Sequence, residues 1–401
     1  MTWKLEALLF LDCSKKTVLL GCTLISLIVL MLLYAKTQYF SPVLLTQPIA
    51  HARTVYVETI KRESMVNENL QLVQQNYSVV NLQKDLPEIQ KPLNLSKGSR
   101  QVAVISVSTP LDGKLDYVFY APLTVLAWKR IGFKTIVLVS GTNQEWSSIS
   151  YLKLVLTTLH DLGATVIFLD PPDGYRVSIS QVSRVFTSGL ASNFLHSSDY
   201  LVMGDSDMFP LNRSSFLLPN DVRILSLNSD CCGWFQHEGE AVRMLPTCTI
   251  GAKVETWREL ISQHRGSLPK TTAQVREYSE ALLGYSLRNV IKGENDGWFA
   301  DQHIISILIK QWQRAHSDSL VRFVPRDVIR DRIDRSYWST DTLQGKVDAH
   351  LLDQPHRSDV WFRVTPLLRQ MFGKESPEFH YVMTYFEQFQ QESRGERQHR
   401  H

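Results

Sequence analysis

Two aspartates, Asp205 and Asp207, are the residues of this sequence whose type and spacing point most directly to chemistry. They follow the apolar stretch Tyr200–Met203, which is typical of a buried strand. Divalent cations such as Mn²⁺ and Mg²⁺ prefer oxygen ligands, and two carboxylates two positions apart at a strand end can hold one cation together. Open α/β sheets bind ligands beyond the carboxyl ends of their strands, so the pair stands where a metal–diphosphate site is expected. The alternative is a solvated turn.

The elements that must position this pair are predicted by alternating patterns upstream of it. Apolar, β-branched runs predict strands, and the longer stretches between them predict helices. The expected strands are Val102–Val107, Lys134–Val139, Ala164–Leu169 and Tyr200–Met203, and the expected helices are Tyr117–Ile131, Ser150–Leu162 and Ser178–Leu195. Strands that alternate with helices form right-handed βαβ units, so we predict an α/β fold with a mostly parallel central sheet and flanking helices.

The regular alternation ends after Pro210. Two strands and four helices are expected beyond it: Val222–Leu227 and Thr247–Ile250, then Val254–His264, Thr271–Asn289, Phe299–Arg314 and Val360–Phe372. We expect one large domain over residues 101–375, followed by a C-terminal helix and polar tail at 376–401. The formal net charge of the 401-residue chain is +3 and its basic residues are scattered among acids, which argues against nucleic acid binding.

An uncharged apolar stretch near the N-terminus, Thr17–Ala35, is long enough to cross a bilayer as a helix. Three lysines precede it and one follows it closely, so the positive-inside rule places residues 1–16 in the cytosol. We therefore expect a single-pass type II protein with a signal anchor at 17–35, a polar stem at 36–100 and a lumenal domain, in the membrane of the Golgi or the endoplasmic reticulum. A cleaved signal peptide is the alternative.

Three of the five cysteines, Cys231, Cys232 and Cys248, lie in the expected lumenal part, where disulfides form. Neighbouring cysteines rarely pair with each other, so we expect Cys248 to pair with Cys231 or Cys232. No C-x-x-C spacing is present, which disfavours a zinc site. N-glycosylation sequons are consistent with a lumenal location and begin at Asn76, Asn94 and Asn212.

Several motifs together resemble the GT-A glycosyltransferases, a fold family whose members use nucleotide-sugar donors. The motifs are the strand start at Val102, the segment Gln181–Arg184, the run Asp205–Leu211, the pair Asp301-Gln302 and the segment Asp348–Leu351. The resemblance covers most of Gln101–Met371 at the level of fold and motif, and the Asp-Gln pair that opens a helix is similar to glycogenin-like members. It implies a Rossmann-like nucleotide-diphospho-sugar transferase fold.

The resemblance implies that Asp205 and Asp207 hold Mn²⁺ or Mg²⁺ against the donor diphosphate. The second aspartate would be the direct ligand, and the first would contact ribose or metal. Such a cation is a Lewis acid that neutralises the charge developing on the departing nucleotide diphosphate. Members of the family often bring a late histidine to the same cation. His350 is the candidate, His356 is its rival, and a structural histidine is the alternative.

The resemblance also implies that Asp301 and Gln302 are catalytic and contact the transferred sugar or the acceptor hydroxyl. In an inverting enzyme Asp301 would be the general base. Trp298 and Asp296 are expected on the acceptor side, where an aromatic ring offers a sugar an apolar surface. Because these residues start a predicted helix, capping by the aspartates and core packing by Trp298 are the alternatives.

Four further residues are expected to bind the nucleotide sugar. Arg184 carries a planar guanidinium that suits diphosphate or nucleotide, and an ion pair on a helix face is its alternative. Ser106, Ser108 and Thr109 end the first strand, where the family places the base and ribose; ordinary turn residues are the alternative.

These features predict a metal-dependent glycosyltransferase. It would move a hexose or similar unit from a nucleotide sugar to a glycan, glycoprotein or glycolipid acceptor in the secretory pathway. Two other hypotheses remain: a catalytically inactive, membrane-anchored binding protein of the same fold, and a nucleotidyltransferase. The second is less favoured, because Ser106–Gly113 is poor in the glycine and lysine that such enzymes usually place after the first strand.

Overall fold

The computed structural model describes residues 99–110, 115–290, 296–325 and 331–399. Across these ranges, no helix is both long and apolar enough to cross a membrane. The expected anchor at 17–35, the stem, and the sequons at Asn76 and Asn94 lie outside the described residues. The third sequon is described, and its Asn212 is exposed.

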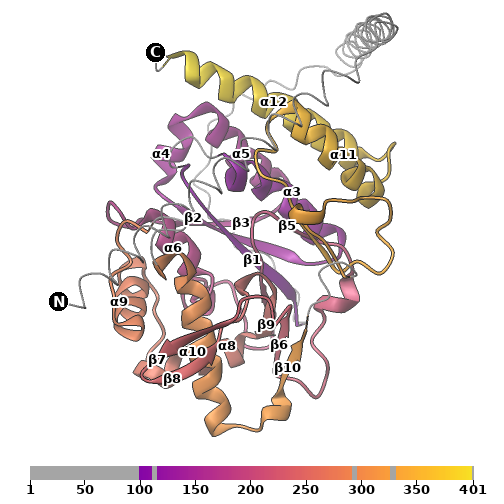
Figure 1. Ribbon diagram of the computed structural model, residues 1–401. Helices are drawn as coiled ribbons and strands as arrows, with labels where there is room; N and C mark the ends of the chain where they lie inside the picture. The colour runs from indigo at the N-terminus through magenta and orange to yellow at the C-terminus, as the bar shows by residue number, and fades with distance from the viewer. Residues whose placement is uncertain (1–98, 111–114, 291–295, 326–330, 400–401) are drawn as a thin grey trace, which may run out of the picture. The chain divides into compact units, whose positions relative to one another are not determined.

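A seven-stranded sheet forms the centre of the fold, in the order β10-β6-β9-β4-β1-β2-β3 (Figure 1). Its strands are β1 (Gln101–Ser108), β2 (Lys134–Ser140), β3 (Thr165–Leu169), β4 (Tyr200–Met203), β6 (Ile224–Leu227), β9 (Ile250–Lys253) and β10 (Val321–Val324). β1 to β4 run parallel, β10 runs parallel to β6, and β9 runs antiparallel to its neighbours β4 and β6. The predicted α/β fold with a mostly parallel central sheet is confirmed.

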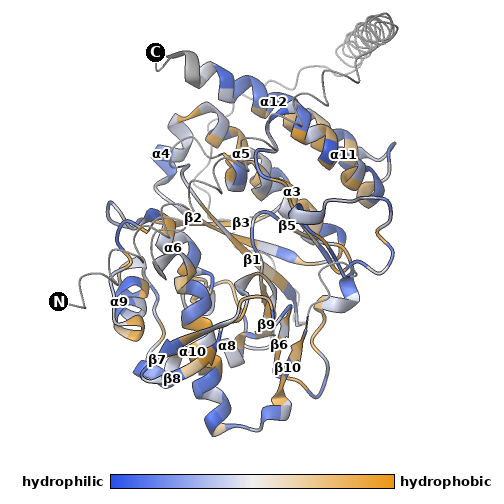
Figure 2. Cartoon of the chain, in the orientation of Figure 1, coloured by the Kyte–Doolittle hydropathy of each residue, from blue (hydrophilic) through white to orange (hydrophobic). Residues whose placement is uncertain are grey.

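Helices cover both faces of this sheet, because successive side chains of a strand point to opposite faces. Ile105 of β1 belongs to one apolar core, which it shares with α3 (Asp116–Arg130), α5 (Ser150–Asp161), α11 (Ser358–Phe372) and α12 (Pro377–His399). Its neighbour Val104 belongs to a second core, shared with α6 (Arg176–Ser183), α8 (Val254–Arg265), α9 (Thr272–Leu283) and α10 (Ala300–Ala315). Figure 2 shows the resulting pattern, with apolar central strands and polar outer faces of the helices.

Three predicted elements have different extents in the structure. The helix expected over Ser178–Leu195 is broken after Ser183, and a short helix α7 (Thr187–Leu190) follows. The helix expected over Thr271–Asn289 ends at Leu283, because Gly284 takes a left-handed conformation with φ of 76° and caps it. The segment Thr247–Thr249 is a turn of 3-10 helix, η3, and the strand begins only at Ile250.

A small second sheet lies beside the central one and consists of β5 (Met208–Pro210), β12 (Asp348–His350) and β11 (Arg332–Ile333). β12 pairs antiparallel with β5, and His350 stands opposite Met208 in this ladder. This pairing brings a segment far along the chain next to the Asp205–Asp207 turn. A separate hairpin is formed by β7 (Trp234–His237) and β8 (Glu240–Arg243).

The disulfide differs from the prediction. Cys231 bonds to its neighbour Cys232, and among the described cysteines Cys248 is a buried free thiol. The expectation that Cys248 pairs with one of them is therefore wrong. The physical reason is position, since the neighbouring pair occupies a surface turn before β7, whereas Cys248 is enclosed in η3. Burial, with a smaller contribution from Asp205, raises the pKa of the Cys248 thiol to about 12.

Candidate functional site

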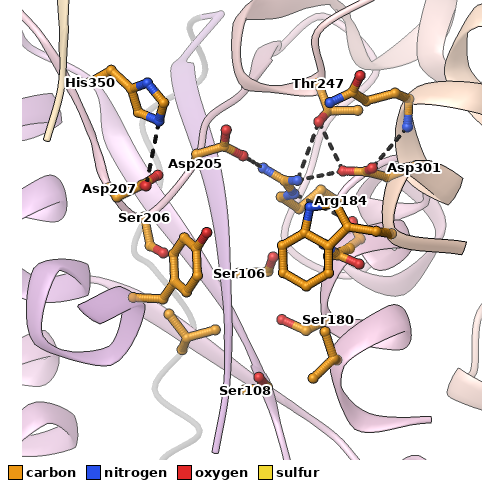
Figure 3. Close-up of a pocket in the computed structure, with 16 residues that line it drawn as sticks. Ser106, Ser108, Ser180, Arg184, Asp205, Ser206, Asp207, Thr247, Asp301 and His350 are labelled. Atoms are coloured by element: carbon orange, nitrogen blue, oxygen red, sulfur yellow. Dashed lines mark hydrogen bonds and ion pairs between the residues drawn. The ribbon is translucent and has the colours of Figure 1, made fainter. Parts of the chain in front are cut away.

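A pocket lies at the carboxyl ends of β1 and β4, where the sequence predicts a ligand site (Figure 3). Its lining comes from the end of β1, the start of α3, α6 and its end, the β4–β5 turn, η3, the turn before α10, the start of α10 and the end of β12. The residues are Ser106, Val107, Ser108, Tyr117, Val177, Ser180, Gln181, Arg184, Asp205, Ser206, Asp207, Thr247, Trp298, Asp301, Gln302 and His350. Most of these side chains are polar, so the pocket suits a ligand rich in oxygen atoms.

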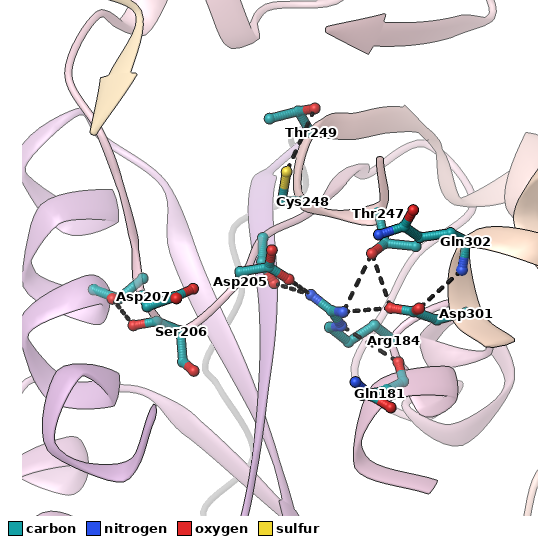
Figure 4. A network of polar contacts seen from close by, with 12 residues as sticks. Gln181, Arg184, Asp205, Ser206, Asp207, Thr247, Cys248, Thr249, Asp301 and Gln302 are labelled. Atoms are coloured by element: carbon teal, nitrogen blue, oxygen red, sulfur yellow. Dashed lines mark hydrogen bonds and ion pairs between the residues drawn. The ribbon is translucent and has the colours of Figure 1, made fainter. Parts of the chain in front are cut away.

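Arg184 is the centre of the polar network on one wall of the pocket (Figure 4). It sits at the point where α6 ends, and its side chain is only 6% exposed. The guanidinium forms an ion pair with Asp205 and, at 2.5 Å, with Asp301; it also donates to the Gly204 carbonyl at 2.8 Å. Burial alone would lower the pKa of Arg184, but these two carboxylates outweigh it and raise the pKa. Arg184 is therefore a charged guanidinium in a fixed position, and the two carboxylates that hold it outweigh its charge locally.

Asp301 has both carboxylate oxygens engaged. Oδ2 accepts from Arg184 and from the Thr247 hydroxyl at 2.8 Å, and Oδ1 accepts from the Gln302 backbone N–H at 2.9 Å. The residue is 3% exposed. In this structure the carboxylate thus positions Arg184 and Thr247 and accepts from one backbone N–H in the first turn of α10. It lies at the site as expected, and the alternative role as the helix cap is not seen, because the N-cap is Phe299.

Asp207 and His350 meet on the opposite wall. The β5–β12 ladder aligns their segments, and the Leu351 N–H donates to the Asp207 carbonyl at 2.9 Å. The His350 Nε2 lies 3.7 Å from the Asp207 Oδ2, while its Nδ1 lies 3.5 Å from a carboxylate oxygen of Asp334. Arg335 also forms an ion pair with Asp207.

The charges on this wall shift both titrating groups toward their charged forms. Burial alone would raise the pKa of Asp207, but contacts with His350 and Arg335 outweigh it and lower the pKa well below its usual range. Burial would lower the pKa of His350, and the contacts with Asp207 and Asp334 raise it instead. Asp207 is therefore a carboxylate at neutral pH, with cationic groups gathered around it.

Asp207 and His350 offer a carboxylate and an imidazole, which are ligand types suited to Mn²⁺. Because its neighbours favour the protonated ring, His350 would have to release a proton to bind a cation. Asp205 instead turns its carboxylate toward Arg184, as Figure 3 shows. Among the residues that the structure describes, no three His, Cys, Asp or Glu side chains converge closely enough to hold a metal. The three expected ligands therefore line one pocket, but only two of them face each other.

The other predicted residues divide between the pocket and its surroundings. Ser106 and Ser108 line it, and so does Trp298. Thr109 does not; its hydroxyl accepts from Arg176 at 3.2 Å. His356 lies 3.9 Å from Asp116 and is not part of the lining, so the structure brings His350 rather than its rival to Asp207.

Asp296, expected on the acceptor side, is the first residue of the 3-10 helix η4 (Asp296–Phe299) that leads into α10. Trp298 of the same turn lines the pocket, so the structure places this turn at its rim.

Sequence reasoning missed Arg335, Thr247 and Tyr117. Arg335 reaches Asp207 from a turn between β11 and β12, and no spacing in the sequence connects the two. The sequence pattern predicts a strand at Thr247, whereas in the structure this residue begins the 3-10 turn η3. Tyr117 lines the pocket from the first turn of α3, and its 38% exposure is unusual for so large a ring. Nothing in the sequence marks Tyr117 as a pocket residue, because an aromatic residue at a helix start gains this role only from the position of the pocket.

Two amide oxygens in the pocket remain unsatisfied. Gln181 Oε1 and Gln302 Oε1 are buried, and neither has a hydrogen-bond partner within the described part of the chain. A buried carbonyl oxygen without a donor costs free energy, so such groups generally receive a partner from a ligand or water. Both residues line the pocket near Arg184 and Asp301. A ligand that donates from hydroxyl groups would satisfy them, whereas a fully ionised phosphate would not.

No protein-family model matches this sequence, and no curated protein matches it either. Solved structures do match. One is the galactosyltransferase LgtC in complex with donor and acceptor sugar analogues, at 14% identity over 70% of this chain and 95% of that chain, with a TM-score of 0.36.

Two further matches contain a metal and a nucleotide sugar. A Drosophila β-1,4-galactosyltransferase 7 variant, in complex with manganese, UDP-Gal and xylobiose, has 12% identity over 65% of this chain and 74% of that chain, with a TM-score of 0.28. The mannosyltransferase PcManGT from Pyrobaculum calidifontis, in complex with GDP-Man and Mn²⁺, has 14% identity over 56% of this chain and 68% of that chain, with a TM-score of 0.29.

These three proteins are glycosyltransferases, the class that the motifs of the sequence resemble. All three TM-scores lie below 0.5. The function proposed below therefore rests on the pocket residues of this chain.

Proposed function

We propose that the chain is a metal-dependent glycosyltransferase that uses a nucleotide-sugar donor. The observation that carries the proposal is the arrangement of one pocket at the ends of β1 and β4. On one wall Asp207 and His350 face each other, and on the other Arg184 is held by Asp205 and Asp301. A cation site and a fixed guanidinium in one polar pocket are the features that a diphosphate ligand requires.

Each part of the pocket has a distinct task in this proposal. Asp207 and His350 would hold Mn²⁺ or Mg²⁺, and a bound cation supplies Lewis-acid neutralisation of the leaving nucleotide diphosphate. Arg184 adds a positive charge whose position does not depend on the metal, because two carboxylates and a carbonyl fix it. Ser106, Ser108 and Tyr117 line the part of the pocket next to the end of β1, which we assign to the nucleoside.

The sugar would lie against Gln181 and Gln302. Their buried side-chain oxygens have no partner among the described residues, and the hydroxyl groups of a sugar ring supply the missing donors. Asp301 acts beside them as a positioning residue, because both its oxygens are already occupied by Arg184, Thr247 and the Gln302 backbone. We assign contact with the transferred sugar to Gln302.

We also propose that the enzyme is a single-pass type II protein of the Golgi or endoplasmic reticulum, anchored by residues 17–35. The proposal rests on the uncharged stretch and the lysines before it. In sealed microsomes we expect the domain from residue 101 onward to resist added protease until detergent is present. Digestion in intact microsomes would contradict this orientation.

A donor panel tests the proposed activity. The full chain is incubated with Mn²⁺ and individual nucleotide sugars, and release of nucleoside diphosphate is measured without an acceptor. We expect slow hydrolysis of one donor, or a few closely related ones, and its loss with EDTA. Donor-dependent thermal stabilisation without any turnover would instead support the inactive binding protein. Hydrolysis that persists in EDTA would contradict the role of the metal.

A further inference from the structure

The β7–β8 hairpin carries an exposed apolar surface next to the proposed site. Trp234, its first residue, is 70% exposed and stands opposite Arg243 in the ladder. The Cys231–Cys232 disulfide occupies the turn immediately before it. Tryptophan is a residue that folding normally buries to a large extent, and this exposed ring comes two residues after the disulfide rather than standing alone.

Both ends of the hairpin lead to segments that contribute residues to the pocket. Before it, the Asn228 side chain donates to the Asp348 carboxylate at 3.5 Å, two residues from His350, and the Cys231 N–H donates to the Asn228 carbonyl at 3.1 Å. After it, the Met244 N–H donates to the Gly233 carbonyl at 2.9 Å. Thr247 of the pocket is three residues further on, which limits its distance from Met244 to about 11 Å.

The opposite face of the hairpin already has its partners. Phe235 stacks on His303 of α10 with ring centroids 4.1 Å apart, and Val242, opposite it in the ladder, is buried. Glu240 forms ion pairs with Lys310 and Arg314 further along the same helix. These contacts fix the hairpin to α10. Because side chains alternate along a strand, Trp234 points away from this interface and is not needed for it.

We propose that Trp234 and the Cys231–Cys232 disulfide form a platform on which a pyranose ring of the acceptor stacks. The flat indole offers an apolar surface to the C–H face of the ring, and the sulfur atoms extend that surface. Gln236 lies on the same face of the hairpin by strand alternation and offers its amide to ring hydroxyls. Arg243 shares this face, and its guanidinium lies over the Phe323 ring at 5.8 Å from the ring centroid.

The inference rests on the proposed function and narrows it, because it makes the acceptor a saccharide chain. The platform would hold a sugar unit beyond the one that reacts, since the hairpin base lies within a few residues of Thr247 while the reaction takes place inside the pocket. A lipid tail would need a larger contiguous apolar patch than one indole and one disulfide. A saccharide, with one apolar face and a polar edge, matches the mixed character of the hairpin.

The test compares Trp234→Ala with Phe362→Ala in the full chain. Phe362 is 73% exposed on α11 and therefore matches Trp234 in exposure and chemical type, at a place unrelated to the pocket. Saturation-transfer NMR is recorded with lactose, cellobiose, chitobiose and mannobiose, in the presence of Mn²⁺ and the nucleoside diphosphate of the hydrolysed donor. The acceptor KM is then measured with the disaccharide that binds.

We expect at least one disaccharide to bind the unmutated chain. Trp234→Ala should weaken that binding and raise the acceptor KM about tenfold, as truncation of an aromatic contact residue commonly does. Trp234→Phe should recover part of the loss, and Phe362→Ala should behave like the unmutated chain. A Trp234→Ala variant with unchanged affinity and KM would overturn the platform, and so would the failure of every disaccharide to bind.

Measuring donor hydrolysis without acceptor shows whether a negative result concerns the Trp234 platform or the proposed glycosyltransferase activity. If the unmutated chain hydrolyses a donor but Trp234→Ala keeps the normal acceptor KM, the platform is wrong and the proposed function stands. If the unmutated chain hydrolyses no donor, the proposed function fails and the platform loses its role in transfer.

Discussion

Arg332 and Arg335 are three residues apart in the sequence, and each forms an ion pair with an aspartate, but the two pairs have different surroundings. Arg332 binds Asp348 through two parallel contacts of 2.5 and 2.6 Å, their side chains are 5% and 2% exposed, and neither residue lines the pocket. Arg335 contacts Asp207 on one side and, at 2.5 Å, the exposed carboxylate of Asp353 on the other. Asp207 also faces His350 and lines the pocket.

The difference shows how one chemical pairing serves two purposes. We call the Arg332–Asp348 pair closed, because two guanidinium nitrogens donate to the two carboxylate oxygens and both side chains are buried away from the pocket. The pair joins β11 to β12 and so stabilises the small sheet that carries His350. We call the Asp207 group open, because its carboxylate contacts both Arg335 and His350 and also lines the pocket. We therefore expect changes at the closed pair to reduce stability and changes at the open group to reduce activity.

Breaking the closed pair should have the largest effect. Asp348→Asn leaves the Arg332 guanidinium buried without its charge partner, and loss of one member of a buried pair typically costs about 3–5 kcal/mol. The free energy of unfolding of the full chain in urea measures it. Asp353→Asn is the control, because its partner is the same type of residue but its carboxylate is 65% exposed, where a pair contributes at most about 1 kcal/mol. Equal losses for the two variants would contradict the distinction.

A second closed pair, Arg100–Asp199, should make the free energy of unfolding depend on pH in the acid range. Burial would raise the pKa of Asp199, but hydrogen bonds from Arg100 and the His196 N–H outweigh it and lower the pKa. The contribution of this carboxylate is therefore present above its unfolded value near pH 3.9 and is lost as the pH falls through the lowered pKa. Asp199→Asn should lower the unfolding free energy at pH 7 by about 2 kcal/mol and flatten its decline below pH 4. If Asp199→Asn left the decline of the unfolding free energy below pH 4 unchanged, the stabilising role of the Asp199 carboxylate would be contradicted.

In the open group, His350→Ala should reduce donor hydrolysis about tenfold, because water can replace one neutral ligand of a cation. Unfolding free energy at pH 7 should change much less than in Asp348→Asn. His356→Ala, which removes the rival histidine outside the pocket, should retain normal hydrolysis. The reverse order of activities would transfer the metal role from His350 to His356.

The smallest effect is expected at Cys248, which lies beside Arg332 in the closed region. Its thiol is buried, has a pKa raised to about 12 by that burial, and forms no disulfide in the structure. Cys248→Ser should leave activity nearly unchanged, and native Cys248 should resist alkylation until the chain unfolds. Non-reducing peptide mapping should find Cys231 joined to Cys232; a fragment in which Cys248 is bonded to either would contradict the structure.

The part of the fold predicted best is the βαβ half. Strands such as Tyr200–Met203 are buried on both faces, so their continuous apolar pattern identifies them directly. Helix ends were predicted less well. α6 stops after Ser183, and the next residue, Arg184, turns its side chain into the pocket to meet Asp205 and Asp301, a tertiary demand that no local pattern encodes.

The site was predicted in part for a similar reason. Asp205 and Asp207 are found by spacing, and His350 by resemblance, but its approach to Asp207 depends on the β5–β12 pairing between segments far apart in sequence. Arg335 was missed because its contact with Asp207 depends on that same pairing. The cysteine prediction was wrong because it rested on the rarity of disulfides between neighbouring residues. The positions of the three thiols in space, which decide the pairing, are set by the tertiary fold.

The most direct measurement compares donor hydrolysis by Asp207→Asn and Asp353→Asn with Mn²⁺ and with EDTA. Both substitutions remove a carboxylate that contacts Arg335, but only Asp207 lines the pocket. We predict that Asp207→Asn lowers hydrolysis about 100-fold or more at a temperature where the variant is fully folded, since a metal contributes several kcal/mol to the transition state. Asp353→Asn should stay close to the unmutated chain, whose activity EDTA should abolish. Hydrolysis that survives both Asp207→Asn and EDTA would mean that the Asp-Ser-Asp turn is structural and that the pocket is not a metal-dependent glycosyltransferase site.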